Sequence, residues 1–193
     1  KTWFRTWYGP NNAVLVLAGD IDLATAKEKA ARYFGSIPAG PSMAQPKVDV
    51  AVRPADTREV MTDKVPQVRI YRAWNVAQVG TEDIDQLQLL GQVLGGAKSS
   101  RLSRRLEHEE KLVDNVSAGA YASQLGSNFM VMATVKQGVD PARVETIIDE
   151  EIDRLVAEGP TADELSRAKT AFRASFIRGI ERIGGFGGKA DAL

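Results

Sequence analysis

Residues 131–160 read VMATVKQGVDPARVETIIDEEIDRLVAEGP, and this stretch decides the fold class. Apolar and more polar residues alternate up to about residue 136, as expected for a strand with one buried face. Asp140 and Pro141 then have the residue types that begin a helix, and apolar residues follow at helical spacing. These apolar positions are Val144, Ile147, Ile148, Ile152, Leu155 and Val156. The sequence therefore predicts a strand followed by an amphipathic helix.

Residues 14–38, VLVLAGDIDLATAKEKAARYFGSIP, repeat this plan in outline. Residues 13–19 are predicted to form an apolar strand, and Asp22 to cap a helix that ends near Gly35. Both stretches combine a strand, a glycine-containing turn, an Asp-capped helix and a closing Gly and Pro. The repetition indicates two related α+β domains, with the chain starting near the end of the first.

Further elements are predicted from residue periodicity and turn signals. Strands are expected over 58–64, 67–75, 112–123 and 128–136, the last two as a hairpin. Helices are expected from Thr81 to about residue 94 and from Ser99 or Ser100 to about Glu110. Thr161 and Glu164 form a capping box for a last helix. Its inward face is predicted to carry Leu165, Ala168, Phe172 and Phe176.

The predicted fold class is α+β, with an antiparallel sheet carrying its helices on one face, preceded by a strand–helix remnant of a related domain. Residues 1–37 are assigned to that remnant. Residues 38–56, which contain four prolines, are assigned to an extended linker. Residues 57–193 are assigned to a second α+β domain that is not catalytic by itself.

Composition excludes several classes of function. Hydrophobic residues make up 44% of the 193 residues and charged residues 26%, which is typical of a chain that buries a core. The 25 basic and 25 acidic side chains leave no basic surplus, so no nucleic-acid partner is expected. No apolar run approaches the roughly 18 residues of a membrane span. With one His and no Cys, the chain cannot supply a two-His metal motif, a thiolate ligand or a cysteine nucleophile.

Three short motifs resemble phosphate-binding or metal-binding sites, but each departs from the pattern that such a site requires. Residues 91–99 resemble a phosphate-binding loop, but Ala97 stands where the lysine is required, and 184–189 fails similarly because Ala190 follows. The cluster at 107–110 (EHEE) is on a predicted helix, where adjacent residues point about 100° apart. We interpret it as a solvated face that pairs with Arg101, Arg104 and Arg105. Trp3, Trp7 and Trp74 are expected to pack in a core or an interface.

The order of landmarks along the chain nevertheless resembles one family. Residues 7–13 (WYGPNNA), 16–22 (VLAGDID) and 33–38 (YFGSIP) resemble the end of the zinc domain of pitrilysin/insulinase-type peptidases. Residues 89–96 and 99–102 (SSRL) resemble a stretch of the domain that follows. The resemblance covers nearly the whole chain.

This resemblance implies that the family's zinc motif, an inverted H-x-x-E-H helix, lies before the first residue of the chain. Zinc is therefore expected in the parent protein and not in this segment. Family members also carry an Arg and, seven residues later, a Tyr that act on the substrate. The alignment puts Glu107 and Asp114 at those positions. A cation and a hydroxyl donor are therefore both replaced by hydrogen-bond acceptors. We predict no catalytic residue and no metal ligand here, and the substrate-binding residues are not identified.

The expected function is that of a non-catalytic, substrate-enclosing segment of a zinc metallopeptidase. A catalytically silent, chamber-forming partner subunit, a scaffolding subunit and an unrelated binding module stay open as alternatives. The expected partners are the rest of the parent chain or a homologous subunit, the parent's peptide substrate, and a second copy of the segment. The resemblance favours an exported bacterial protein, either periplasmic or membrane-associated.

Overall fold

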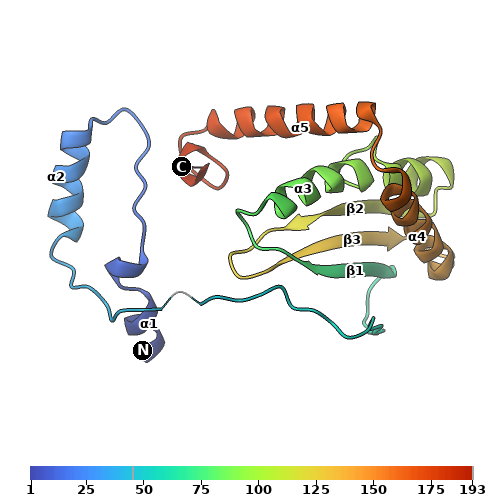
Figure 1. Cartoon of the computed structure of the whole chain (residues 1–193), viewed down its shortest axis with the longest axis horizontal. Coiled ribbons are helices and arrows are strands. Elements are labelled where there is room, and N and C mark those ends of the chain that lie inside the picture. The colour runs from blue at the N-terminus through green and yellow to red at the C-terminus, as the bar shows by residue number, and fades with distance from the viewer. Residues whose placement is uncertain (45, 193) are drawn as a thin grey trace. The chain divides into compact units, whose positions relative to one another are not determined.

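The computed structural model describes residues 1–44 and 46–192, and they divide into two units. One unit comprises residues 1–46 and 172–193, and the other comprises residues 47–171. The elements, labelled in Figure 1 where there is room, are α1 (Thr2–Trp7), η1 (Pro10–Asn12), α2 (Leu23–Phe34), β1 (Arg69–Val76), α3 (Glu82–Leu94), η2 (Ser103–Glu109), β2 (Val113–Tyr121), β3 (Ser127–Val135), α4 (Pro141–Glu158), α5 (Ala162–Ile180) and α6 (Lys189–Ala192).

The second unit is built on a three-stranded antiparallel sheet with the order β1-β3-β2. In the register, Tyr71 lies opposite Met132 and Met132 opposite Ser117. β2 and β3 form the predicted hairpin, with a β-bulge between Val113 and Asn115. The α+β prediction with an antiparallel sheet is confirmed.

One face of this sheet packs against helices to form the core. Alternate residues of each strand point to the same face, and Ile70, Val116 and Val131 are buried on it. They join Leu94 of α3 and Ile148 of α4 in one hydrophobic cluster. On the opposite face, the alternating residues are exposed or half-buried. The helices therefore cover one side of the sheet, as predicted.

Three of the predicted helix starts have side-chain caps, whereas Thr81 precedes α3 without a side-chain capping bond. Asp22 Oδ1 accepts from the Thr25 N–H at 2.9 Å, and Asp140 Oδ1 accepts from the Ala142 N–H at 3.0 Å. Thr161 and Glu164 form a reciprocal capping box, with bonds of 2.8 and 3.2 Å at the start of α5.

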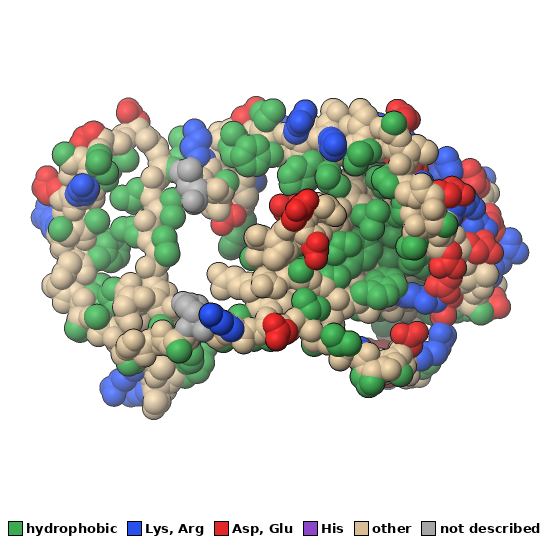
Figure 2. Space-filling model, in the orientation of Figure 1, with side chains coloured by type: hydrophobic (Ala, Val, Ile, Leu, Met, Phe, Trp, Pro, Cys, Tyr) green, Lys and Arg blue, Asp and Glu red, His purple; other side chains and the backbone are tan. Residues whose placement is uncertain are grey.

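Two predicted strands are wrong. Residues 13–19 and 58–64 form no regular structure. A strand persists only where another strand satisfies its backbone groups and a layer covers its apolar side, and neither segment has these. Val14 is 90% exposed and Met61 86%. Figure 2 shows apolar side chains gathered along the extended segment between η1 and α2.

Other local predictions also need correction. The helix predicted to reach about Glu110 starts as α-helix at Arg101, but residues 103–109 are π-helical. Phe172 and Phe176, predicted to face inward on α5, are exposed, because the buried positions of that helix end at Ala168. The three tryptophans do not lie in the core, since each is more than two-fifths exposed.

Candidate functional site

The region that the sequence singled out, residues 99–114, folds as η2 and its two flanks. η2 buries Leu106, while Leu102 just before it is also fully buried. η2 ends at Glu109, and Lys111 follows with a φ of 56°, a left-handed conformation that is uncommon outside glycine. A π-helix and a residue in the left-handed conformation therefore lie within ten positions of each other.

Glu107, at the position where the resemblance implies an arginine, is half-buried and bonded within its own domain. Its Oε1 accepts from the backbone N–H of Val116 at 2.8 Å. β2 is an edge strand, so the N–H groups of alternate residues point away from β3, and that of Val116 is one of them. Glu107 therefore satisfies one outward backbone donor of the sheet edge.

Asp114, at the position where the resemblance implies a tyrosine, lies in the β-bulge of β2. Its Oδ2 accepts a hydrogen bond from Nε2 of Gln67, which lies just before β1. Both carboxylates are thus occupied by neighbours in the same fold. Neither can donate a hydrogen bond in its ionised form, which is what an arginine or a tyrosine would do.

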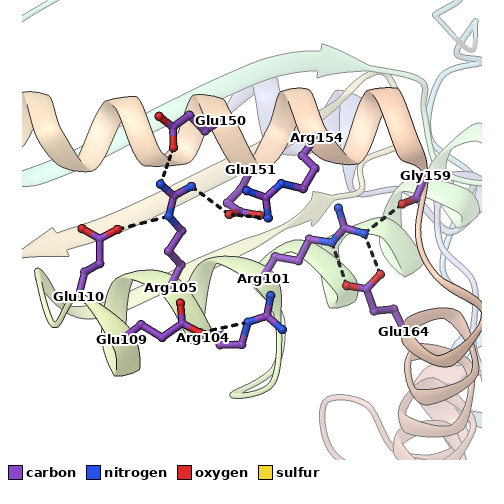
Figure 3. A network of polar contacts seen from close by, with 10 residues as sticks. All are labelled: Arg101, Arg104, Arg105, Glu109, Glu110, Glu150, Glu151, Arg154, Gly159 and Glu164. Atoms are coloured by element: carbon purple, nitrogen blue, oxygen red, sulfur yellow. Dashed lines mark hydrogen bonds and ion pairs between the residues drawn. The ribbon is translucent and has the colours of Figure 1, made fainter.

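Arg105 of η2 forms an ion-pair network with α4 (Figure 3). Arg105 lies at its centre and pairs with Glu110 at 3.3 Å, Glu150 at 2.5 Å and Glu151 at 3.1 Å. Glu151 is only 2% exposed and also pairs with Arg154 at 3.4 Å. A buried carboxylate is tolerated when cations surround it. The network therefore joins η2 to α4.

Arg101 makes a second, separate connection, to the start of α5. Its guanidinium donates two hydrogen bonds of 2.8 Å to the Glu164 carboxylate and one of 3.0 Å to the Gly159 carbonyl. This bidentate contact lowers the pKa of Glu164 to about 2, with the capping bonds from Thr161 adding to the effect. The interpretation that Arg101 pairs with the cluster at 107–110 is wrong for this residue.

Arg104 and Arg105 do pair within that cluster. Arg104 lies 3.6 Å from Glu109, and Arg105 pairs with Glu110. Glu110 also pairs with Arg143 of α4 at 2.6 Å, and this hydrogen bond is the main reason that the pKa of Glu110 lies below its usual value. Sequence reasoning missed the long-range partners because they are 33 to 63 residues away, although acidic residues on α4 and the capping Glu164 were visible.

A depression of about 260 Å³ lies beside this network. It is lined by Arg105, Glu110, Arg143, Thr146, Ile147 and Glu150. Its two arginines and two glutamates neutralise one another, as the ion pairs above describe. The depression therefore offers no uncompensated charge to a ligand.

These residues do not fit zinc. The single histidine, His108, is exposed on η2, and the carboxylates beside it at 107 and 110 are held by backbone or arginine donors. Among residues 1–44 and 46–192, no group of three or more histidines and carboxylates is placed to hold a metal ion. A zinc site needs three or four such ligands, so no chemical step can be derived through a metal in this segment.

Sequence comparison places the chain in a family. A model described as the peptidase M16 inactive domain matches residues 1–172. The chain belongs to the peptidase M16 inactive-domain family. It is the non-catalytic part of a zinc-protease-like protein, in agreement with the expectation from the resemblance.

Curated relatives of the M16 inactive domain carry zinc-protease names. The chain is 25% identical over 186 residues to "Uncharacterized zinc protease YmxG" of Bacillus subtilis, covering 94% of the chain and 43% of the relative. It is 26% identical over 189 residues to "Zinc protease PqqE" of Helicobacter pylori, covering 94% and 41%. The chain therefore spans about two-fifths of the length of these relatives.

Solved structures share the fold of the M16 inactive domain. A protease from Helicobacter pylori superimposes with a TM-score of 0.79 at 24% identity, covering 95% of this chain and 45% of that one. A peptidase M16 inactive domain from Pseudomonas fluorescens gives a TM-score of 0.65 at 20% identity, covering 81% and 38%. The periplasmic protease PqqL from Escherichia coli gives 0.57 at 18% identity, covering 93% and 20%.

Proposed function

We propose that this M16 domain encloses the peptide substrate of a zinc metallopeptidase and leaves the chemistry to another domain of the parent protein. The observation that carries the proposal is the inactive-domain match over residues 1–172, together with the carboxylates Glu107 and Asp114 bonded within their own fold. A zinc ion, with its water activated for attack on the peptide bond, would be held upstream of Lys1.

The domain boundaries follow from the same proposal. Residues 1–37 complete the upstream domain, and residues 57–193 belong to the enclosing domain. Residues 38–56 form the linker between these two domains. The apolar segment 13–19 would then add a strand to the upstream sheet, which would cover Val14 and its neighbours. This accounts for an exposed apolar segment that is next to an amphipathic helix, α2.

The decisive experiment is on the parent. Its upstream sequence is expected to contain H-x-x-E-H, and the purified parent is expected to bind one zinc and to cleave peptides, with activity lost on chelation and restored by zinc. The present chain, tested in parallel, is expected to bind no stoichiometric zinc after dialysis. Close to one zinc per chain, lost in His108→Ala, would contradict the proposal.

A second function is favoured by one specific observation. Glu107 and Asp114 are hydrogen-bond acceptors at the two positions where the resemblance implies the donors Arg and Tyr. This is expected for a catalytically silent partner subunit that only shapes a chamber. A parent without H-x-x-E-H, inactive alone but required for the activity of a homologous subunit, would support this reading over the first.

The proposed cellular location is that of an exported bacterial protein, either periplasmic or membrane-associated. No helix in the described part of the chain is both long and apolar enough to cross a membrane. A similar fold occurs in a periplasmic protease. Fractionation of cells that produce the full-length parent tests this location.

A further inference from the structure

Helix α5 changes in character at its middle. Residues 162–171 carry two acidic and two basic side chains. In this half Ala168 is buried, and Glu164 is held by Arg101. Residues 172–189 run from the second half of α5 through the loop that follows it (Figure 1). They contain four basic side chains and one acidic one. We refer to residues 172–189 as the α5 extension.

The α5 extension exposes a row of bulky apolar side chains. Phe172, Phe176 and Ile180 follow the buried Ala168 at steps of four residues, so they continue the apolar stripe of the helix. Phe176 is nevertheless 57% exposed. The family match ends at residue 172, and the extension lies outside the second unit. The hydrophobic cluster of the described residues includes none of these three side chains, so the stripe is open to a partner.

The loop at the end of the extension holds a phenylalanine in solvent. Phe186 is 96% exposed. Arg182 Nη2 donates to the Phe186 carbonyl at 3.0 Å, and the Lys189 N–H donates to the Arg182 carbonyl at 2.7 Å. The glycines on either side, Gly185 and Gly187, have φ values of 83° and 71°, which other residues rarely adopt. The loop backbone is therefore stabilised by its own hydrogen bonds, while the ring of Phe186 stays in solvent.

The basic side chains of the extension are available to an anionic partner. Arg173, Arg178 and Lys189 are exposed, and, unlike Arg167 earlier in the helix, none of them forms an ion pair in the described part of the chain. The whole chain has equal numbers of basic and acidic side chains, so this segment concentrates a positive charge that the rest of the chain lacks. Cations beside exposed aromatic rings are the features by which amphipathic helices bind anionic membrane surfaces.

We propose that the α5 extension binds the surface of a bilayer that contains anionic phospholipids. The lipid phosphates attract the cations, and the apolar side chains enter the boundary between the headgroups and the acyl chains. An acidic polypeptide would attract the cations equally well, but it offers no apolar layer to an aromatic ring at the tip of a loop. The proposal goes beyond the enclosure of a peptide and does not depend on it.

The helical repeat determines which cation takes part. Arg173 lies one turn from Phe176, so it is on the side of the apolar stripe. Its apolar stem can lie along the boundary while its guanidinium reaches the phosphates. Arg178 is two residues from Phe176 and therefore points to another side of the helix. A helix that lies along the bilayer through its apolar stripe brings Arg173 to the headgroups and leaves Arg178 in water.

The test is co-sedimentation of the 193-residue chain with lipid vesicles. Vesicles of phosphatidylglycerol and phosphatidylcholine in equal parts are the probe, and vesicles of phosphatidylcholine alone are the control. Binding to the control vesicles is expected to be at least about tenfold weaker, because each cation near an anionic surface strengthens binding about fivefold. Added salt is expected to weaken binding to the anionic vesicles without abolishing it, since salt screens charges but not apolar contacts.

Single substitutions separate the apolar contribution from the charge contribution. Phe186→Ser is expected to weaken binding about tenfold, because it removes a ring that the bilayer would bury. Arg173→Ser should weaken binding about fivefold, and Arg178→Ser, on another side of the helix, by less than about twofold. Val156→Ser, at an exposed position of α4, is the control for loss of an exposed apolar side chain and should leave binding unchanged. Ile183→Ser replaces Phe186→Ser if circular dichroism shows that the first variant misfolds.

No binding to the anionic vesicles, or equal binding to the two kinds of vesicle, would overturn the proposal. Equal losses for Arg173→Ser and Arg178→Ser, with none for Phe186→Ser, would also overturn it, because attraction would then depend on charge alone. Polyglutamate that competes for the segment under those conditions would assign it to an acidic polypeptide instead. The full-length parent is tested in the same way. If the parent does not bind vesicles that the 193-residue chain binds, another part of the parent covers the segment and the proposal is wrong.

Discussion

Residues 13–19 and β3 have similar apolar sequences and opposite structural outcomes. β3 lies between two strands, with Val131 fully buried. Residues 13–19 have no strand beside them, and Val14 is 90% exposed. In the described residues, every buried apolar side chain of the core lies between Ile70 and Ala168. An apolar run is therefore only a candidate strand, and the neighbouring chain decides whether it becomes one.

The largest expected difference between these regions is in hydrogen exchange. Amides at 129–135 should exchange only through openings that approach the global free energy of unfolding, about 5 kcal/mol or more. Amides at 13–19 should exchange at nearly the rate of an unfolded chain. The measurement is made at two protein concentrations, because protection that rises with concentration would mean that another copy completes the sheet. Slower exchange at 13–19 than at 129–135 in the monomer would contradict the comparison.

Two matched Leu→Ala substitutions, one in each region, test the same comparison through the free energy of unfolding. Leu106→Ala removes a fully buried side chain and should lower the free energy of unfolding by about 2–5 kcal/mol. Leu15→Ala removes a side chain that is 52% exposed and should change it by less than about 0.5 kcal/mol. Urea denaturation followed by circular dichroism compares them, and equal effects would mean that residues 13–19 are packed in solution.

The link between Arg101 and Glu164 should make the second unit sensitive to acid. Because the pKa of Glu164 is lowered to about 2 in the folded state, its contribution is fully present above the unfolded value near 4.5 and is lost as pH falls toward 2. The loss amounts to about 3 kcal/mol by proton linkage. Glu164→Gln should show a smaller fall in urea midpoint between pH 5 and pH 2 than the unmodified chain. Glu28→Gln, an exposed carboxylate on α2, is the control and should follow the unmodified chain.

The smallest expected effect concerns catalysis by the parent. Asp114→Ala and Glu107→Ala should change its kcat/KM only a few-fold, since both side chains serve the fold of this domain. Removal of a donor that stabilises an oxyanion typically lowers kcat by about 10²–10³. A loss of that size for Asp114→Ala, with the circular dichroism spectrum unchanged, would show that residues 107–114 are misaligned with the family.

Local signals in the sequence were sufficient for most of the second unit. Asp140 with Pro141 and the Thr161–Glu164 box start α4 and α5 where expected, because a cap needs only residues within one turn. The hairpin of β2 and β3 was also visible from alternation. The strand at 13–19 was predicted wrongly because its neighbours cannot be read from its own residues.

Polar contacts between residues far apart in the sequence were also not predicted correctly. Arg101 was assigned to the nearby acidic cluster, but it binds Glu164, 63 residues away. The roles of Glu107 and Asp114 in the sheet edge and bulge likewise depend on strand register, which the pattern alone leaves open. The absence of metal ligands and catalytic residues stays a prediction that follows from residue supply.

Lys111 is a position at which a substitution can stabilise this domain. Its φ of 56° places a side chain with a β-carbon in a left-handed conformation, which costs about 1 kcal/mol relative to the right-handed region. Lys111→Gly should relieve most of that cost at the junction between η2 and β2, although glycine also gives the unfolded chain more freedom. The substitution, or an asparagine at the same place, is a starting point for a more heat-resistant version of the domain.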